Sequence, residues 1–292
     1  MTAVVPPAGG APGIDVAPPA GLLRTLSRHR GFRVGAVLAI MLAALALIGP
    51  LLAHGPNVTD YANQLAPPDA RHWLGTDSAG RDEFARTVAG ARTTLGAAML
   101  VFALTTVIGI AVGAAAGFLG GIFDVCTSRL IDLLLGLPSL VLALAVVGAL
   151  GPGFSHLVLA VTVTGWAGLA KLSRSYTVGA RGRPDVTAAR MAGVRTSRVL
   201  AGHVLPGAAV QALIAATLGL GDTILGLAGL SFLGLGVQPP TAEWGNMLSD
   251  SQLYVTVAPW LVIGPGLGII AAVTAATLIS DALRDCTDPG RG

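Results

Sequence analysis

Residues that commonly carry chemistry are few in this chain and are not grouped as in a catalytic centre. Cys126 and Cys286 lie far apart, which predicts neither a disulfide framework nor a metal cluster. There is no Gly-x-Ser-x-Gly or His-Glu-x-x-His pattern and no pair of acids in a context that suggests hydrolysis. No two histidines have the i, i+4 spacing of metal ligands: His29, His54, His72, His156 and His203. We therefore predict a protein that is not an enzyme and holds no metal.

The single lysine also argues against a nucleotide site of the P-loop type. Such a loop needs Gly-x4-Gly-Lys-Ser/Thr, so that the lysine reaches the phosphates. Lys171 is followed by Leu172, and no glycine-rich turn precedes it. We expect no ATP site of this kind and no cofactor on this chain.

The most suggestive spacing lies between Lys171 and His203, a stretch that holds the lysine and six of the 17 arginines. Pro184 suits the first position of a helix, because its missing N–H would have no partner there. Asp185 suits the first turn, where the helix dipole favours an acid, and Gly193 suits the left-handed position that closes a helix. The sequence thus predicts a short helix that begins at Pro184 and closes at Gly193.

A second helical stretch, Ser197 to His203, is expected to lead from this short helix to Pro206. The first helix is too short to be stable alone in water, so we expect it to pack into a groove on a partner protein. The alternative is an amphipathic connector that lies on anionic lipid headgroups.

Composition places these residues in a membrane protein. Only 11% of the 292 residues are charged, against about 25% in a soluble domain. A spanning helix needs roughly 20 mostly apolar residues. Four blocks without Asp, Glu, Lys or Arg are long enough for one or more spans, at 34–59, 93–123, 133–170 and 251–280. We predict an all-α integral membrane protein.

Six transmembrane helices account for these blocks. Gly151-Pro152-Gly153 divides the third block in two, and glycines at 109, 113 and 117 give the second helix a face that another helix can approach closely. The six expected spans are 34–54, 93–120, 133–150, 154–170, 206–235 and 255–278.

Positive charge predicts the orientation. Segments 24–33 and 171–203 carry eleven Lys and Arg against one acid, whereas 54–92 and 238–250 carry four against seven. By the positive-inside rule, both termini and the arginine-rich loop face the cytoplasm. Because the positive charges flank hydrophobic spans and lack interleaved aromatic residues, we expect a lipid bilayer as the surroundings and no nucleic acid as partner.

One motif in the basic loop resembles a known family. From Thr187 to Pro206 the chain reads TAA-x3-G-x9-HVLP, which resembles the EAA loop of binding-protein-dependent ABC importer permeases. Segments 74–92, 230–250 and 280–289 resemble those of the dipeptide, oligopeptide and nickel permeases, in particular the C-type subunit. The motif and the three segments, taken together in this order, are strongly specific for this family. The family usually has Glu where this chain has Thr187, and Asp185, two residues earlier, is a candidate replacement for that acid.

The resemblance implies a division of the chain into five parts. These are a disordered, basic cytoplasmic segment (1–33), a first transmembrane helix (34–54), an extracytoplasmic polar segment (55–92), a permease domain with five helices (93–282) and a cytoplasmic tail (283–292). The permease domain contains the cytoplasmic coupling loop, 171–204, which would dock on an ATPase. Its candidate coupling residues are Asp185, Thr187, Ala188, Ala189, Gly193, Arg195, His203 and Pro206.

The resemblance also implies the partners and the setting. A homologous B-type permease subunit would complete a heterodimer, with two ABC ATPase subunits or one fused ATPase that bind ATP and Mg. An extracytoplasmic substrate-binding protein would deliver a peptide, and the assembly would lie in a bacterial inner membrane. Nickel chelates or haem remain alternative substrates, and a secondary carrier or channel without an ATPase remains an alternative function.

Four charged residues outside the coupling loop are further candidates. Asp222 is expected near the middle of the fifth helix, either on the translocation path, where it would attract a peptide ammonium group, or in a helix–helix hydrogen bond. Asp77, Arg81 and Asp82 are candidates for receiving the binding protein. As the plainer alternative, Asp77 caps a helix and Arg81 pairs locally.

Trp244 and Trp260 are expected near the outer end of the sixth helix, as interfacial aromatic residues.

Overall fold

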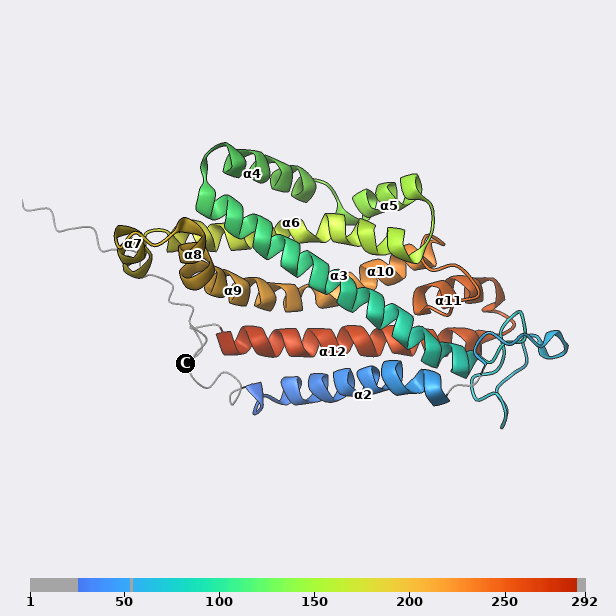
Figure 1. The fold of residues 1–292 in the computed structure, drawn as a ribbon. Coiled ribbons are helices and arrows are strands. Elements are labelled where there is room, and N and C mark those ends of the chain that lie inside the picture. The colour runs from blue at the N-terminus through green and yellow to red at the C-terminus, as the bar shows by residue number, and fades with distance from the viewer. Residues whose placement is uncertain (1–25, 53–54, 288–292) are drawn as a thin grey trace, which may run out of the picture.

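The computed structural model describes residues 26–52 and 55–287, and all of its elements there are helical. Predictions for 1–25, for 53–54 and for 288–292 lie outside the described residues. The long helices run in a similar direction and form an elongated bundle (Figure 1). This confirms the all-α fold.

Five helical segments of the described chain are long and apolar enough to cross a membrane, and a bent pair of helices makes a sixth if it is counted as one span. The long helices are α2 (Arg30–Leu52), α3 (Glu83–Leu119), α6 (Phe154–Ala180), α9 (Leu205–Leu218) and α12 (Ile263–Thr287). A short helix and a π-helical turn, Thr196–Val204, extend the α9 segment to membrane-spanning length.

Helices α3 and α6 cross at the predicted glycine face. A Cβ added at Gly109 would lie 2.6 Å from Cβ of Leu169, and one at Gly117 would lie 2.7 Å from the carbonyl oxygen of Arg174. At Gly113 an added Cβ would collide with the carbonyl oxygen of Ala170. The role of these glycines in close helix packing is therefore confirmed.

The expected third span, 133–150, is wrong as a single straight helix. The chain forms α4 (Gly121–Gly136) and α5 (Ser139–Leu150), bent by 97° with respect to one another. Pro138 causes the break, because the residue before a proline is driven out of helical conformation, and Leu137 is extended with φ −102° and ψ 142°.

The stretch 121–132, which the expected spans leave between two helices, is not a loop. It belongs to α4, and its two acids pair with α6. Nε and Nη2 of Arg174 donate to Asp124, at 2.5 and 2.8 Å, and Lys171 Nζ donates to Asp132 at 3.0 Å. The same stretch of α6 continues to Ala180, ten residues beyond the predicted end at 170. Charges that find partners across helices do not end a helix.

Helix α3 begins at Glu83 and not at the predicted residue 93. Asp82 is its N-cap, and its carboxylate accepts a hydrogen bond from Ala85 N at 2.7 Å. Arg86, in the first turns, is only 1% exposed and is held by several acceptors. The charges of 83–92 therefore belong to a helix and not to the polar segment.

The expected fifth and sixth spans also differ from the structure. Helix α9 ends at Leu218, and Gly219 separates it from α10 (Leu220–Phe232), so 206–235 is not one continuous helix. The last span begins with a 3-10 turn, Pro259–Val262, which leads into α12, and not at 255.

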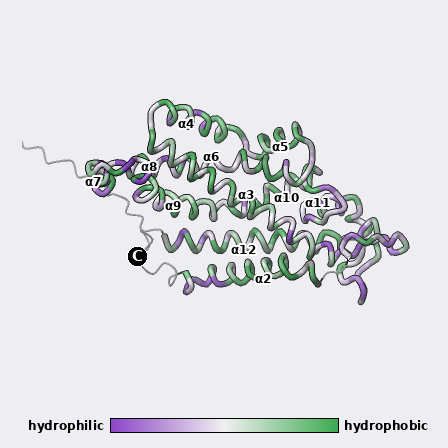
Figure 2. Tube along the Cα trace, viewed as in Figure 1, coloured by the Kyte–Doolittle hydropathy of each residue, from purple (hydrophilic) through white to green (hydrophobic). Residues whose placement is uncertain are grey.

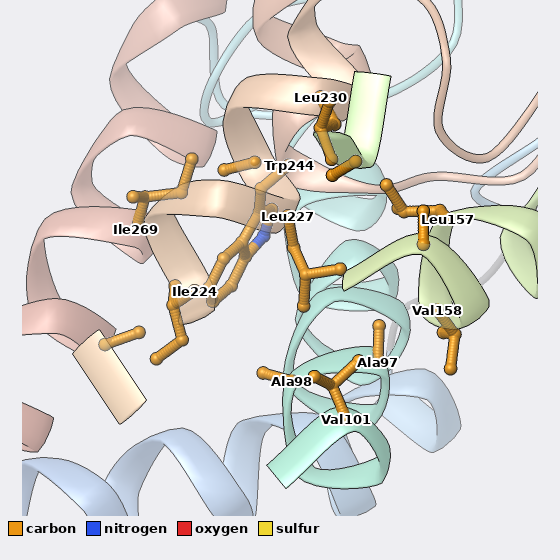
Figure 3. Close-up of a cluster of buried hydrophobic side chains, with 14 of the residues drawn as sticks. Ala97, Ala98, Val101, Leu157, Val158, Ile224, Leu227, Leu230, Trp244 and Ile269 are labelled. Atoms are coloured by element: carbon orange, nitrogen blue, oxygen red, sulfur yellow. The ribbon is translucent and has the colours of Figure 1, made fainter. Parts of the chain in front are cut away.

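A short helix, α11 (Trp244–Ser251), lies in the stretch that had been expected only to be polar. Its Trp244 is fully buried, which corrects the prediction of an interfacial residue. The indole lies among Leu227, Ile224 and Ile269 (Figure 3), in a core that also contains Ala97 and other residues of α3. The sequence around Trp244 does not reveal this packing, because the residues that cover the indole belong to other helices, among them α10 and α12.

Both ends of the bundle are more hydrophilic than its middle (Figure 2). Hydrophilic residues gather around α7 (Pro184–Met191) and α8 (Thr196–Val199) at one end, and around the 55–82 segment at the other. The start of α2 and the end of α12 lie at the same end as α7 (Figure 1). His29 and Asp285 also meet there, 3.5 Å apart.

Candidate functional site

The predicted short helix in the basic loop is present as α7, with Pro184 in its first turn. Gly193 closes it with φ +74°. Gly193 N donates to the carbonyl of Arg190 at 3.0 Å, and Val194 N donates to the carbonyl of Ala189 at 3.1 Å. This pair of bonds is a Schellman motif, which satisfies carbonyls at a helix end and needs a left-handed residue.

One face of α7 is anchored and the other is free. Val186 is fully buried in a small cluster with Phe118, Val199 and Val204, and Ala189 packs against the cluster. The other candidate coupling residues are exposed: Asp185, Thr187, Ala188, Gly193, Arg195, His203 and Pro206. Met191 is 85% exposed. The chain thus presents a small, mostly polar surface beyond the ends of the apolar helices.

Asp185 is already paired within the loop. Nε and Nη2 of Arg183 donate to its two carboxylate oxygens, each at 3.1 Å. Burial acts to raise the pKa of Asp185, but the hydrogen bonds and charge of Arg183, together with the Val186 N–H, hold that pKa below its usual value. Asp185 is therefore an ionised group that is engaged by Arg183.

A π-helical turn, Leu200–Val204, connects α8 to α9 and contains His203. Leu205 N donates to the carbonyl of Leu200, five residues back. Pro206 has no N–H and its ring crowds the carbonyl four residues earlier, which accounts for the widened turn. Gly207 follows directly, and a Cβ added there would collide with the hydroxyl of Tyr176 unless that side chain moved.

A pocket of about 450 Å³ opens among α3, α5, α6, α9 and α10. Asp222 is the one charged residue among the described residues that line it, and most of the lining is small or apolar, including Thr105, Gly165, Gly168 and Thr223. Asp222 lies in the first turn of α10, at the break after Gly219, and not in the middle of a helix. That correction has a physical reason, since free N–H groups at a helix start favour an acid.

The side chain of Asp222 is exposed and makes no hydrogen bond or ion pair to any residue that the structure describes. A carboxylate within a membrane-spanning region is costly unless it faces a partner or a water-filled cavity. Asp222 lines the pocket and so has a cavity to face.

At the opposite end of the bundle, Asp77, Arg81 and Asp82 lie in one turn before α3. Oδ1 of Asp77 accepts from the N–H groups of Ala79 and Arg81, at 2.8 and 2.9 Å, and its Oδ2 accepts from Arg81 Nε at 2.6 Å. The local pairing of Arg81 is confirmed. The N-cap of α3 is Asp82 and not Asp77. The carboxylate of Asp77 instead binds N–H groups within the turn that precedes the helix.

Asp82 also contacts His72, whose Nδ1 lies 2.8 Å from its Oδ2. All three charged residues of this turn thus have structural partners.

The buried residue Arg86 ties this turn to distant parts of the chain and was missed by sequence reasoning. Its Nε lies 3.4 Å from Asp77 Oδ2, and its Nη1 donates to Asn57 Oδ1 and to the carbonyl of Pro240, each at 3.2 Å. It thereby joins the 55–82 segment, α3 and the loop before α11. Only its place in the run of charges before a long apolar block could have signalled it.

Glu243 and Thr94 were also missed. Glu243 is 3% exposed and caps α11 by accepting from Gly245 N and Asn246 N, at 3.0 and 2.9 Å. Thr94 Oγ1 donates to Glu243 at 3.1 Å and accepts from Trp244 N at 3.0 Å. The acid that directly precedes the Trp-Gly pair was the available signal.

The chain matches two family models. The model described as binding-protein-dependent transport system inner membrane component matches residues 109–291, which include α7 and most of the pocket lining. The model described as N-terminal TM domain of oligopeptide transport permease C matches residues 21–68.

Curated relatives match along nearly the whole chain. The nickel transport system permease protein NikC of Escherichia coli K12 is 38% identical over 90% of this chain and 96% of its own. The dipeptide transport system permease protein DppC of Alkalihalophilus pseudofirmus is 36% identical over 91% and 88%. A probable D,D-dipeptide transport system permease protein, DdpC of E. coli K12, is 35% identical over 88% and 87%. The chain therefore belongs to the binding-protein-dependent transport system inner membrane components, as an ABC importer permease of the dipeptide, oligopeptide and nickel group.

Proposed function

We propose that this chain forms one half of the translocation pathway of an ATP-driven importer for dipeptides or oligopeptides and couples to separate ATPase subunits through α7. The observation that carries the proposal is the exposed surface of α7, which is rigidly closed by Gly193 and anchored by Val186. A displacement of α7 would reach α3, because the anchoring side chain of Val186 packs in the same cluster as Phe118 of α3.

The coupling would work by alternating access. Closure of the ATPases around ATP and Mg would displace α7, and the displacement would pass through Val199 and Val204 to α9 and thus to the pocket. The π-helical turn before Pro206 is a place where the helix can change its path, as such turns often are. No covalent chemistry is assigned to this chain.

Asp222 would supply the polar contact on the path. In a pocket with small and apolar walls, an unpaired carboxylate attracts the ammonium group of a peptide. A B-type permease would close the other side of the path. We propose peptides as substrates because the names of two relatives above, DppC and DdpC, specify dipeptide transport. NikC, whose name specifies nickel, makes a nickel chelate the competing substrate.

The end of the bundle that carries Asp77, Arg81 and Asp82 would receive an extracytoplasmic binding protein. This follows from the positive-inside rule, which puts the arginine-rich α7 end and both termini in the cytoplasm of a bacterial inner membrane. The network centred on Arg86 holds that receiving surface in shape.

The proposal is tested by co-purification of the tagged full-length chain with an ATPase subunit in mild detergent. Gly193→Arg and Met191→Arg each place a bulky cation on the exposed surface of α7. Thr59→Arg is the matched control, because it adds the same charge at an exposed position of the opposite end.

Wild type and Thr59→Arg are expected to retain the ATPase, and both α7 variants to lose most of it. Wild-type protein that purifies without an ATPase would contradict the proposal, as would α7 variants that keep their partner. A secondary carrier would then be the better account.

A further inference from the structure

Two arginines near α7 line one pocket and form no ion pair with the residues that the structure describes. Lys171, Arg174 and Arg183 all form ion pairs with carboxylates. Four arginines of the loop form none with the residues that the structure describes: Arg181, Arg190, Arg195 and Arg198. The charge of Arg181 nevertheless acts on Asp124, which pairs with Arg174. What sets Arg181 and Arg190 apart is that they line one pocket of about 510 Å³, together with Phe118, Leu119, Val194 and Thr196.

Arg181 is held against the end of α3 and lacks acceptors. Gly120 follows the last residue of α3 with φ +69°, and a Cβ added there would lie 3.1 Å from Arg181 Nη2. The Nε and Nη2 atoms of Arg181 are covered, yet they donate no hydrogen bond within the described chain. A cation at a helix C-terminus gains from the dipole, but the dipole supplies no acceptor for these donors. Covered donors without acceptors indicate a missing partner.

Arg190 reaches the same place from α7. Its guanidinium carbon lies 4.8 Å from the centre of the Phe118 ring. This cation–π contact fixes the guanidinium while leaving its N–H groups free to donate. The two positive charges therefore converge on the last turn of α3, and Thr196 lines the same pocket.

The surroundings of the pocket are apolar and exposed. Leu119 is 64% exposed, and Ile122 and Phe123, at the start of α4, are 84% and 46% exposed. These side chains lie at the end of a membrane-spanning helix, where acyl chains would cover them. A site with two cations and a hydroxyl beside an exposed apolar strip fits a ligand with an anionic head and an apolar tail.

We propose that this pocket binds the phosphate of an anionic membrane phospholipid, with Arg181, Arg190 and Thr196 around the headgroup and the acyl chains along Leu119, Ile122 and Phe123. Basic pockets at the ends of transmembrane helices are suited to such headgroups. Because Arg190 belongs to α7 and Phe118 to α3, an occupied site would tie the proposed coupling helix to the membrane surface.

The test measures lipid binding by native mass spectrometry of the delipidated full-length chain. The chain is titrated with dioctanoyl phosphatidylglycerol, with dioctanoyl phosphatidylcholine and with inorganic phosphate. Arg181→Gln combined with Arg190→Gln removes the two charges of the pocket. Arg195→Gln combined with Arg198→Gln removes two charges from exposed positions of the same loop that do not line the pocket, and is the control for lipid binding.

Wild type and the control are expected to bind phosphatidylglycerol about tenfold or more tightly than phosphatidylcholine. The pocket variant is expected to lose that preference. The single variant Arg190→Gln, at an exposed position, is expected to lose part of the preference and provides the test if the double variant does not fold.

Three results would overturn the proposal. Equal losses in the pocket variant and the control would indicate diffuse attraction to the basic loop. Competition by inorganic phosphate as effective as that of the lipid would indicate a site for free anions. Unchanged lipid binding with loss of a co-purified ATPase would assign the two arginines to an acidic partner protein.

Discussion

Thr94 and Glu243, 149 positions apart in the sequence, share a buried hydrogen bond of 3.1 Å between α3 and the start of α11. The same hydroxyl accepts the N–H of Trp244 at 3.0 Å. Trp244 Nε1 in turn donates to the carbonyl of Thr87 at 2.8 Å. One threonine therefore fixes the orientation of the short helix that covers the core of the bundle.

Thr94→Val is expected to destabilise the protein, because it leaves Trp244 N without an acceptor in a buried place. The expected loss is about 1–3 kcal/mol, seen as a lower melting temperature in detergent. Thr277→Val is the control, since within the described chain that exposed hydroxyl bonds only to the carbonyl of Val273 in its own helix. Equal melting temperatures for the Thr94 variant and wild type would show that the bond contributes nothing.

Gly113→Ala is expected to separate α3 from α6, because the new Cβ would collide with the carbonyl oxygen of Ala170. Overpacking of this kind costs about 1–3 kcal/mol. Gly96→Ala is the matched control in the same helix, where an added Cβ meets nothing within 4 Å. It should be neutral or slightly stabilising. The prediction fails if thermal unfolding shows the two variants to be equally stable.

Gly193→Ala is expected to loosen α7 without unfolding the bundle. A left-handed conformation costs a residue with a side chain about 1–2 kcal/mol, and Gly193 has φ +74°. Hydrogen exchange of the amides of 186–194 should accelerate while that of α3 stays the same. Gly179→Ala, at an exposed helical position with nothing within 4 Å of the added Cβ, should leave exchange in α7 unchanged. Identical exchange in both variants would rule out the closing role of Gly193.

Asp222→Asn is expected to lower peptide uptake at subsaturating concentration by about tenfold or more, since a charge-assisted hydrogen bond to the peptide ammonium group is lost. The melting temperature should not fall, because Asp222 has no partner to lose within the described chain. Asp132→Asn, whose carboxylate is exposed and pairs with Lys171, is the control for a charge lost outside the pocket. Full uptake by the Asp222 variant would remove that residue from the path.

Local chemistry made several features predictable from the sequence. The helix between Pro184 and Gly193 depends on residues within ten positions of one another, and so does the break at Pro152. The glycine face at 109–117 follows from helical periodicity alone. These features need no knowledge of what packs against them.

The features that were mispredicted depend on contacts across long separations. Asp124 had been expected in the connection between two spans, but it lies within α4 and pairs with Arg174, 50 positions away. Trp244 had been assigned to the membrane interface, but residues from α10 and α12 bury it. A run of charges does not reveal which partners it will meet after folding.

Uptake by the reconstituted assembly shows directly whether this chain works in an ATP-driven importer. The tagged chain, its partner permease and the ATPase are placed in proteoliposomes with the α7 end facing inward, and a labelled dipeptide is presented outside with the binding protein. We expect uptake only with hydrolysable ATP inside, and loss of uptake in Met191→Arg. Uptake driven by an ion gradient without ATP, or full uptake by Met191→Arg, would contradict it.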